Sequence, residues 1–323
     1  MTQALRLGTR RSPLALHQAR MARAALQAVW PELEVELVEM VSDGDRDTRQ
    51  LQDIAERGIF AHVLERALRD GEIDAAVHSS KDLELTAAEG LELVAWLPRE
   101  DPRDALVGPP GGTSLLDLPI DATVATGSAR RMAGLRTVRA DLTPNPIRGN
   151  VATRIELSRE RGDAGCLLAM AGLTRLGLVA ERDDITPVPI DQIVPEAGQG
   201  AVVIQARAHV CERTGIAWGR IDDIGTRRAA ELEREISLRL GGGCEHPVGI
   251  HVELPASTVH AFAAPSPHEA GTRIRMELVG LELAPLLSVA SPEDIADAVR
   301  WVATQLAPTI AEQLGIEHTL ERT

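Results

Sequence analysis

Aromatic side chains are nearly absent from this chain of 323 residues, which has no tyrosine, two phenylalanines and four tryptophans. Stacking platforms for single-stranded nucleic acid need aromatic faces, so this scarcity argues against such a surface. Hydrophobic residues still make up 44% of the chain. The cores must therefore be built from leucine, valine, isoleucine and alanine, and the length predicts two or three domains.

Cysteine is also scarce, with three widely spaced residues at Cys166, Cys211 and Cys244. An odd, scattered set predicts no disulfide framework and favours the reducing cytoplasm. The N-terminus lacks the apolar core of a signal peptide, and no apolar run approaches membrane-spanning length. The formal net charge of −14 disfavours non-specific binding to nucleic acid or to anionic membranes.

Lysine occurs once, at Lys81, among 34 basic side chains. It stands in HSSKD (78–82), directly before Asp82. A lysine side chain is a compact point charge, whereas arginine is a flat, wide fork. Lys81 is therefore either a chance survivor of an arginine-rich composition or the small cation that a tight pocket beside a working carboxylate requires.

Apolar runs alternate with amphipathic helical patterns over the first two hundred residues, which predicts a largely parallel α/β sheet. Strands are expected at 4–8, 35–40, 73–79, 123–127, 146–150, 166–172 and 201–206, and helices at 13–29 and 60–71. PREDPRD at 98–104 interrupts the alternation, and the glycine-rich AGQG at 197–200 precedes the last of these strands. Beyond residue 222 a helix (226–240), three strand-like runs and a terminal helix (292–314) predict a small α+β domain.

The sequence thus predicts two α/β lobes joined by paired crossings, followed by a third domain. The expected boundaries are 1–98 with 199–218 for the first lobe, 103–195 for the second and 222–323 for the third domain. Ligands of such sheets bind at the carboxyl ends of the strands, in the crevice between the lobes.

Three predicted strand-to-helix turns carry arginine together with serine, threonine or glycine: GTRRS (8–12), TGSARR (126–131) and RGN (148–150). Residues 126–154 contain six arginines and a single acid. Backbone N–H groups at a helix start bind anions, and bidentate arginine–carboxylate bonds are strong. A single arginine is usually a solvated charge, but three such turns predict a site for an anion with several carboxylates or phosphates. Without a P-loop or GxGxxG motif, a nucleotide is the weaker choice.

Asp82 follows a predicted strand and points towards the same crevice, where neighbouring cations would keep it ionised and able to hold a cationic intermediate or shuttle a proton. GGGC at 241–244 sets a cysteine after three glycines, which predicts a flexible, bare loop with an approachable sulfur. A metal site through Cys244, His246 and His251 has poor ligand spacing and lacks a fourth partner.

Collinear motifs from about residue 5 to residue 250 resemble the porphobilinogen deaminase (hydroxymethylbilane synthase) family. They read GTRRSPLAL, GIF, DAAVHSSKD, EDPRDALV, TGSARR, IRGNVATR, LAMAGLTRLGL, AGQGA and GGGCEHPVG. The resemblance implies a cytoplasmic monomer of three domains, the first two like a type II periplasmic binding protein. It further implies deamination of four porphobilinogen molecules, their head-to-tail coupling on a covalent dipyrromethane cofactor, and release of hydroxymethylbilane by hydrolysis.

The resemblance also assigns residues. Cys244 carries the dipyrromethane through a thioether, and Asp82 is the catalytic aspartate that assists loss of ammonia and stabilises the cationic methylene-pyrrole. No metal is implied. The residues implied to bind the cofactor are Lys81, Ser128, Arg130, Arg131 and Arg154, and those implied to bind the substrate are Arg10, Ser12, Gln18, Phe60, Arg148, Arg175 and Gln199.

Some positions depart from the family pattern. The lid over the site usually reads Gly-Gly-Lys-Gly-Leu-Phe but here is AERGIF (55–60), which predicts a stiffer lid of altered charge. Glu84 stands where a proline is common, and Gly127 where a serine is usual. These changes concern rate and lid motion more than reaction type.

Two alternatives remain open from the sequence. A non-catalytic anion-binding protein could use the same two lobes, although it would have no use for Cys244. A degenerate relative could bind pyrroles without polymerising them, and measured turnover would separate it from an active enzyme.

Overall fold

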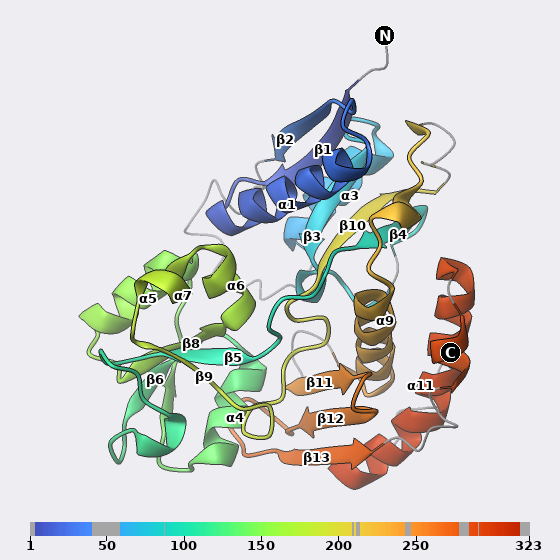
Figure 1. Ribbon diagram of the computed structural model, residues 1–323. Coiled ribbons are helices and arrows are strands. Elements are labelled where there is room, and N and C mark those ends of the chain that lie inside the picture. The colour runs from blue at the N-terminus through green and yellow to red at the C-terminus, as the bar shows by residue number, and fades with distance from the viewer. Residues whose placement is uncertain are drawn as a thin grey trace. The chain divides into compact units, whose positions relative to one another are not determined.

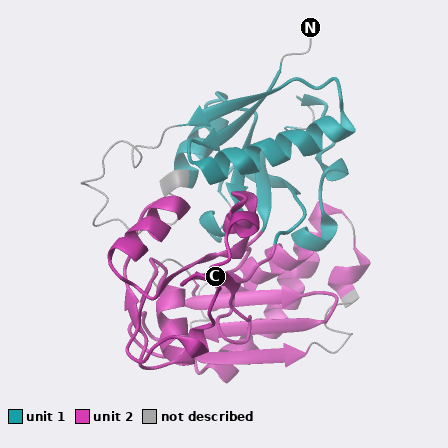
Figure 2. Cartoon of the chain, turned by 60° about the vertical axis from the view of Figure 1, so that its left-hand side comes forward, with its two compact units in different colours: residues 1–100, 201–227 teal, residues 101–200, 228–323 magenta. Residues whose placement is uncertain are grey.

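The structure is a computed structural model that describes residues 4–40, 59–86, 88–208, 210, 214–242, 247–277, 284–289 and 291–316. The chain divides into two compact units, residues 1–100 with 201–227 and residues 101–200 with 228–323 (Figure 2). No helix in the described part of the chain is long and apolar enough to cross a membrane.

The first unit is built on a five-stranded sheet with the order β2-β1-β3-β10-β4 (Figure 1). Its strands are β1 (Leu5–Arg10), β2 (Val35–Met40), β3 (Ala75–Ser79), β4 (Leu91–Trp96) and β10 (Val202–Arg207). β1 runs parallel to β2 and β3, whereas β10 is antiparallel to β3 and β4. The other elements are α1 (Pro13–Val29), α3 (Ile59–Arg69) and the short helices η1 (Ser80–Asp82) and η3 (Trp218–Arg220).

Helix α1 shows how the sequence sets a local boundary. Ser12 caps the helix by accepting the backbone N–H of Ala15 at 3.2 Å, and Pro13 fills the first helical position, where no N–H is needed. Ala19, Ala22 and Leu26, spaced along one face, are completely buried against the first sheet. The predicted helix 13–29 is confirmed.

The second unit contains two sheets. One has the order β7-β6-β8-β5-β9, with β5 (Asp104–Val107), β6 (Thr123–Ala125), β7 (Thr143–Asn145), β8 (Gly165–Ala169) and β9 (Ile185–Pro187). Its helices are η2 (Leu115–Asp117), α4 (Ala129–Val138), α5 (Val151–Glu160), α6 (Met170–Arg175) and α7 (Leu178–Glu181).

The other sheet is antiparallel, with β11 (Val248–Glu253), β12 (Thr258–Ala263) and β13 (Thr272–Glu277) in chain order. It is accompanied by α9 (Ile224–Arg239), α10 (Ala284–Ser288) and α11 (Pro292–Leu314) (Figure 1). Ile250 of β11, Ile236 of α9 and Val302 of α11 belong to one buried apolar cluster, so both helices contribute to the core of this sheet.

The predicted fold class is confirmed: two five-stranded α/β sheets of matching order are followed by a small α+β region. The expectation of largely parallel sheets is wrong, because β10 and β5 each run antiparallel to both of their neighbours. Two predicted strands are wrong in extent. Residues 146–150 form a loop, because Pro146 has no N–H for a ladder and Asn150 already caps α5. The strand expected at 166–172 ends at Ala169, where α6 begins. The proposed division into three domains stays a prediction.

Candidate active site

A small pocket in the first unit gathers residues from the carboxyl ends of β1 and β3. Because these strands are parallel neighbours, their ends lie at the same edge of the sheet. The pocket has a volume of about 50 Å³, and its lining comprises Arg10, Ser12, Leu14, Ala15, Gln18, Ala61, Val77, His78, Ser79 and Asp82. The structure therefore brings together four residues predicted from the sequence, namely Arg10, Ser12, Gln18 and Asp82.

The floor of the pocket is held by hydrogen bonds between side chains, and the carboxylate of Asp82 is exposed to solvent. Gln18, only 3% exposed on α1, donates from Nε2 to Ser79 Oγ at 2.8 Å and accepts the Ser79 hydroxyl at Oε1, 3.2 Å away. Asp82 ends the short helix η1 and is exposed, while Lys81 beside it is half-buried. A ligand can thus reach the Asp82 carboxylate while the side chains beneath it are held in place.

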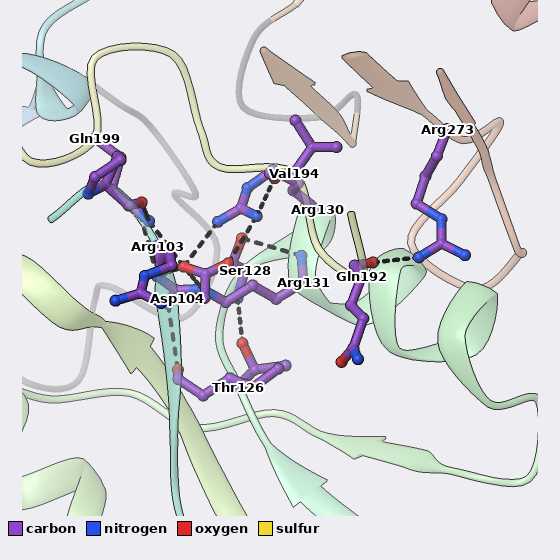
Figure 3. Close-up of polar contacts among 12 residues, drawn as sticks. Arg103, Asp104, Thr126, Ser128, Arg130, Arg131, Gln192, Val194, Gln199 and Arg273 are labelled. Carbon is purple, nitrogen blue, oxygen red and sulfur yellow. Dashed lines mark hydrogen bonds and ion pairs between the residues drawn. The ribbon is translucent and has the colours of Figure 1, made fainter. Parts of the chain in front are cut away.

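A buried ionic network dominates the second unit (Figure 3). Asp104 is 0% exposed and accepts from Arg130 at 2.8 and 3.2 Å and from Arg131 at 2.8 and 3.0 Å. Burial alone would raise the pKa of Asp104, but the charges and hydrogen bonds of Arg130 and Arg131 outweigh it and hold that pKa far below its usual range. Arg130 and Arg131 are therefore buried side chains whose guanidinium groups are paired with Asp104 inside the unit.

Gln199 completes the network. Its Nε2 donates to Asp104 Oδ1 at 2.9 Å and to the Pro102 carbonyl at 2.6 Å, and its Oε1 accepts from Arg131 Nη2 at 3.3 Å. Arg175 donates from Nη2 to the Gly200 carbonyl at 2.6 Å. Three of the predicted binding residues thus hold the glycine-rich turn in place, and their direct contact with a ligand stays a prediction.

Two loops of the second unit meet at the start of α4. Ser128 caps this helix by accepting the N–H of Arg131 at 3.4 Å. Gly127 lies so close to the neighbouring turn that a Cβ there would stand 2.5 Å from the Ile147 carbonyl oxygen. A serine at position 127 would push the two turns apart, so glycine allows their close approach.

The turn after Ile147 holds the more accessible arginines. Arg148 is exposed, and Arg154 is half-buried with its Nε donating to the Gly149 carbonyl at 2.6 Å. Together with the α4 N-terminus, these side chains give one side of this unit several donors for carboxylates.

Comparison with known proteins identifies the family of the chain. The family model described as "Porphobilinogen deaminase, dipyromethane cofactor binding domain" matches residues 5–213. The porphobilinogen deaminase of Roseiflexus sp. (strain RS-1) is 43% identical over 255 residues, which cover 79% of this chain and 83% of that protein. That of Syntrophomonas wolfei is 40% identical over 257 residues, covering 79% and 83%. The chain belongs to the porphobilinogen deaminase family.

Two solved structures of other proteins share less sequence with the chain than these relatives do. The alkanesulfonate-binding protein SsuA from Xanthomonas axonopodis is 15% identical, with a TM-score of 0.37 over 73% of this chain and 74% of that one. The methionine-binding protein MetQ is 16% identical, with a TM-score of 0.41 over 67% and 90%.

Cys244, which the sequence predicts to carry the cofactor, and lid residues 55–58 lie outside the described residues, as does the Phe60 side chain. The structure does describe how α9 ends just before the cysteine. Gly241 has a φ of 70°, its N–H reaches the Leu238 carbonyl at 3.1 Å, and the N–H of Gly242 reaches the Ser237 carbonyl at 2.7 Å. This is a Schellman cap, so the first two glycines of GGGC terminate α9, and the flexibility of the loop stays a prediction.

Alanine at position 242 is expected to destabilise the fold. A Cβ there would stand 2.2 Å from Ser237 Oγ and 2.6 Å from the Ser237 carbonyl oxygen. Overpacking of this kind costs about 1–3 kcal/mol of unfolding free energy, which urea denaturation would measure. Gly225→Ala is the control, because its nearest neighbour would be 3.5 Å away. Equal stability of the two variants would contradict the crowding at Gly242.

Sequence reasoning missed two buried acids that organise this porphobilinogen deaminase relative. Asp104 lies in the chain-breaking PREDPRD and in the motif EDPRDALV, but neither pattern assigns it a role, and no pattern singles out Glu233. Glu233 is 0% exposed on α9 and contacts the turn that contains Gln199. Within the described residues, no group of three His, Cys, Asp or Glu side chains could hold a metal ion.

Proposed function

We propose that the chain condenses four porphobilinogen molecules head to tail, with loss of ammonia at each addition, and releases linear hydroxymethylbilane by hydrolysis. Family membership makes it a transferase of tetrapyrrole synthesis. The observation that carries the proposal is the pocket in which the exposed Asp82 carboxylate shares a lining with Arg10 and Ser12. That combination suits a substrate that is anionic at its edge and becomes cationic at its reacting carbon.

Five polar residues of the pocket have a chemical task in this proposal. Arg10 and the Ser12 hydroxyl bind the acetate and propionate of porphobilinogen through charge-assisted hydrogen bonds. When the amino group of the aminomethyl substituent leaves as ammonia, the Asp82 carboxylate stabilises the positive charge left on the methylene-pyrrole. It then accepts the ring proton that is lost after the new carbon–carbon bond forms. Gln18 and Ser79 keep the base of the pocket rigid.

The described residues fit a dipyrromethane group in the second unit. When bound, this group supplies a pyrrole carbon with a free α position, to which the first substrate is joined. Its carboxylates are proposed to be held by Ser128 and Arg154, beside the α4 N-terminus that Arg130 and Arg131 support through Asp104, and its attachment point to be Cys244. The fit is supported by the capped α4 N-terminus and by its close approach to the turn before Arg148.

Intact mass under denaturing conditions tests the proposal. The expected result is a chain heavier than 34.7 kDa by two deaminated porphobilinogen units, an excess that Cys244→Ser removes. Cys166→Ala is the matched control, because burial raises the pKa of that thiol to about 11 and keeps it unreactive. A mass that stays at the bare-chain value even after porphobilinogen is added would refute the enzyme and favour an anion-binding protein.

A further inference from the structure

Glu233 is a completely buried carboxylate on which three backbone segments meet. Its Oε2 accepts the N–H of Gly198 at 2.7 Å, and its Oε1 accepts the N–H of Val252 at 2.9 Å. His251 Nδ1 lies 3.0 Å from the same Oε1. A carboxylate is costly to bury unless its oxygens are hydrogen-bonded, so these contacts are needed to keep it inside. Glu233 therefore ties α9 and β11 to the turn at 197–200.

The turn held in this way connects directly with the ionic network. Gln199, the next residue after Gly198, bonds through its side chain to Asp104 and Arg131. The Gly200 carbonyl that follows accepts from Arg175. If the Gly198 N–H is displaced, the backbone of the next two residues moves with it. That movement alters the hydrogen bond between Gln199 and Arg131 and the one between Arg175 and the Gly200 carbonyl.

β11 also packs closely against Val194, three residues before the turn at 197–200, and against Arg130. A Cβ on Gly249 would stand 2.7 Å from the Val194 carbonyl oxygen and 3.2 Å from Arg130 Cδ. Arg130 itself donates from Nη1 to the Val194 carbonyl at 2.6 Å (Figure 3). The strand after the Cys244 segment and the helix before it are thus both fixed relative to Arg130 and Gln199.

We infer that Glu233 is a positioning residue for the arginines of the second unit: through Gly198 it sets Gln199 against Arg131, and through Val252 it keeps β11 beside Arg130. It acts through these neighbours and not on the substrate directly. The inference rests on the proposed function only for its catalytic consequence, because the bracing itself is independent of any reaction.

The variant Glu233→Gln tests the inference with almost no change in volume. Its amide has one acceptor oxygen and places an NH₂ group where Glu233 now accepts, so either Gly198 or Val252 with His251 loses its acceptor. Hydrogen exchange is expected to accelerate about tenfold or more at whichever of the Gly198 and Val252 amides loses its acceptor, since protection depends on local opening. kcat should fall roughly 10- to 100-fold, as expected for small misplacements of binding groups. KM should stay within about twofold, because the Asp82 pocket lies in the first unit, and the dipyrromethane mass should be retained.

Glu235→Gln is the matched control. Glu235 lies two residues further along α9 and pairs with Arg239 at 2.8 Å, and its replacement should leave both exchange at Gly198 and kcat unchanged. If Glu233→Gln fails to fold, Glu233→Asp provides the same measurements with the charge retained. Wild-type exchange at both Gly198 and Val252 in a folded Glu233 variant, or faster exchange with unchanged kcat, would overturn the inference. Absence of turnover in the wild-type protein would instead sink the proposed function and leave the exchange result standing.

Discussion

Asparagine at position 82 is expected to lower kcat by about 10²- to 10⁴-fold, the usual contribution of a positioned acid–base group. The amide has nearly the same shape as the carboxylate but can neither balance the positive charge on the methylene-pyrrole nor accept its proton. Folding should be unaffected, since Asp82 is exposed at the end of η1. Steady-state turnover of porphobilinogen measures the effect, and intact mass should show that the dipyrromethane is still attached.

Glu84→Gln separates the chemistry of Asp82 from a general loss of negative charge. Glu84 is also exposed, lies two residues further on, and has its Oε1 3.4 Å from Nε2 of His62 on α3. Its replacement should change kcat less than about twofold, because exposed ion pairs contribute little. An Asp82→Asn enzyme with turnover close to that of Glu84→Gln would remove Asp82 from the reaction.

The pocket around Asp82 could be predicted from the sequence because its residues follow strands. GTRRS spans the end of the first strand and HSSKD spans the end of the third, and parallel strands bring such ends to one edge of a sheet. Gln18 is predicted by the resemblance alone. No local pattern shows that its amide would pair with Ser79, 61 residues away.

The partner of the two central arginines could not be predicted. TGSARR predicts a helix N-terminus whose backbone N–H groups and arginine side chains face a ligand. The structure instead buries Arg130 and Arg131 on Asp104, which lies 26 and 27 residues earlier. PREDPRD has the composition of a chain breaker, and neither periodicity nor spacing reveals that its last aspartate begins a fully buried strand.

Glu233 was missed for a similar reason. In AELEREISLR its charge looks like the solvated face of an amphipathic helix. It is buried because β11 and the turn at 197–200 provide donors on that side of α9. The end of α9 at Gly241, in contrast, can be predicted from the sequence, because a glycine directly after a helical pattern commonly terminates the helix.

Replacing Asp104 by asparagine is expected to lower the free energy of unfolding by about 3–5 kcal/mol, the cost of breaking a buried ion pair on one side. The variant leaves the guanidinium groups of Arg130 and Arg131, which are 4% and 5% exposed, without their counter-charge. Urea denaturation at neutral pH measures the loss. Asp101→Asn is the control, because Asp101 pairs with the more exposed Arg103 and should cost less than about 1 kcal/mol.

The pH dependence of that difference tests its electrostatic origin. Because the two arginines hold the folded-state pKa of Asp104 below the unfolded value of about 3.9, the ionised carboxylate stabilises the fold above that unfolded pKa. The stabilisation is lost as the pH falls towards the folded-state pKa. The stability gap between the wild-type protein and Asp104→Asn should therefore be constant from about pH 5 to pH 8 and narrow below about pH 4. A gap that widened on acidification would mean that asparagine disturbs packing and that charge pairing is not what Asp104 contributes.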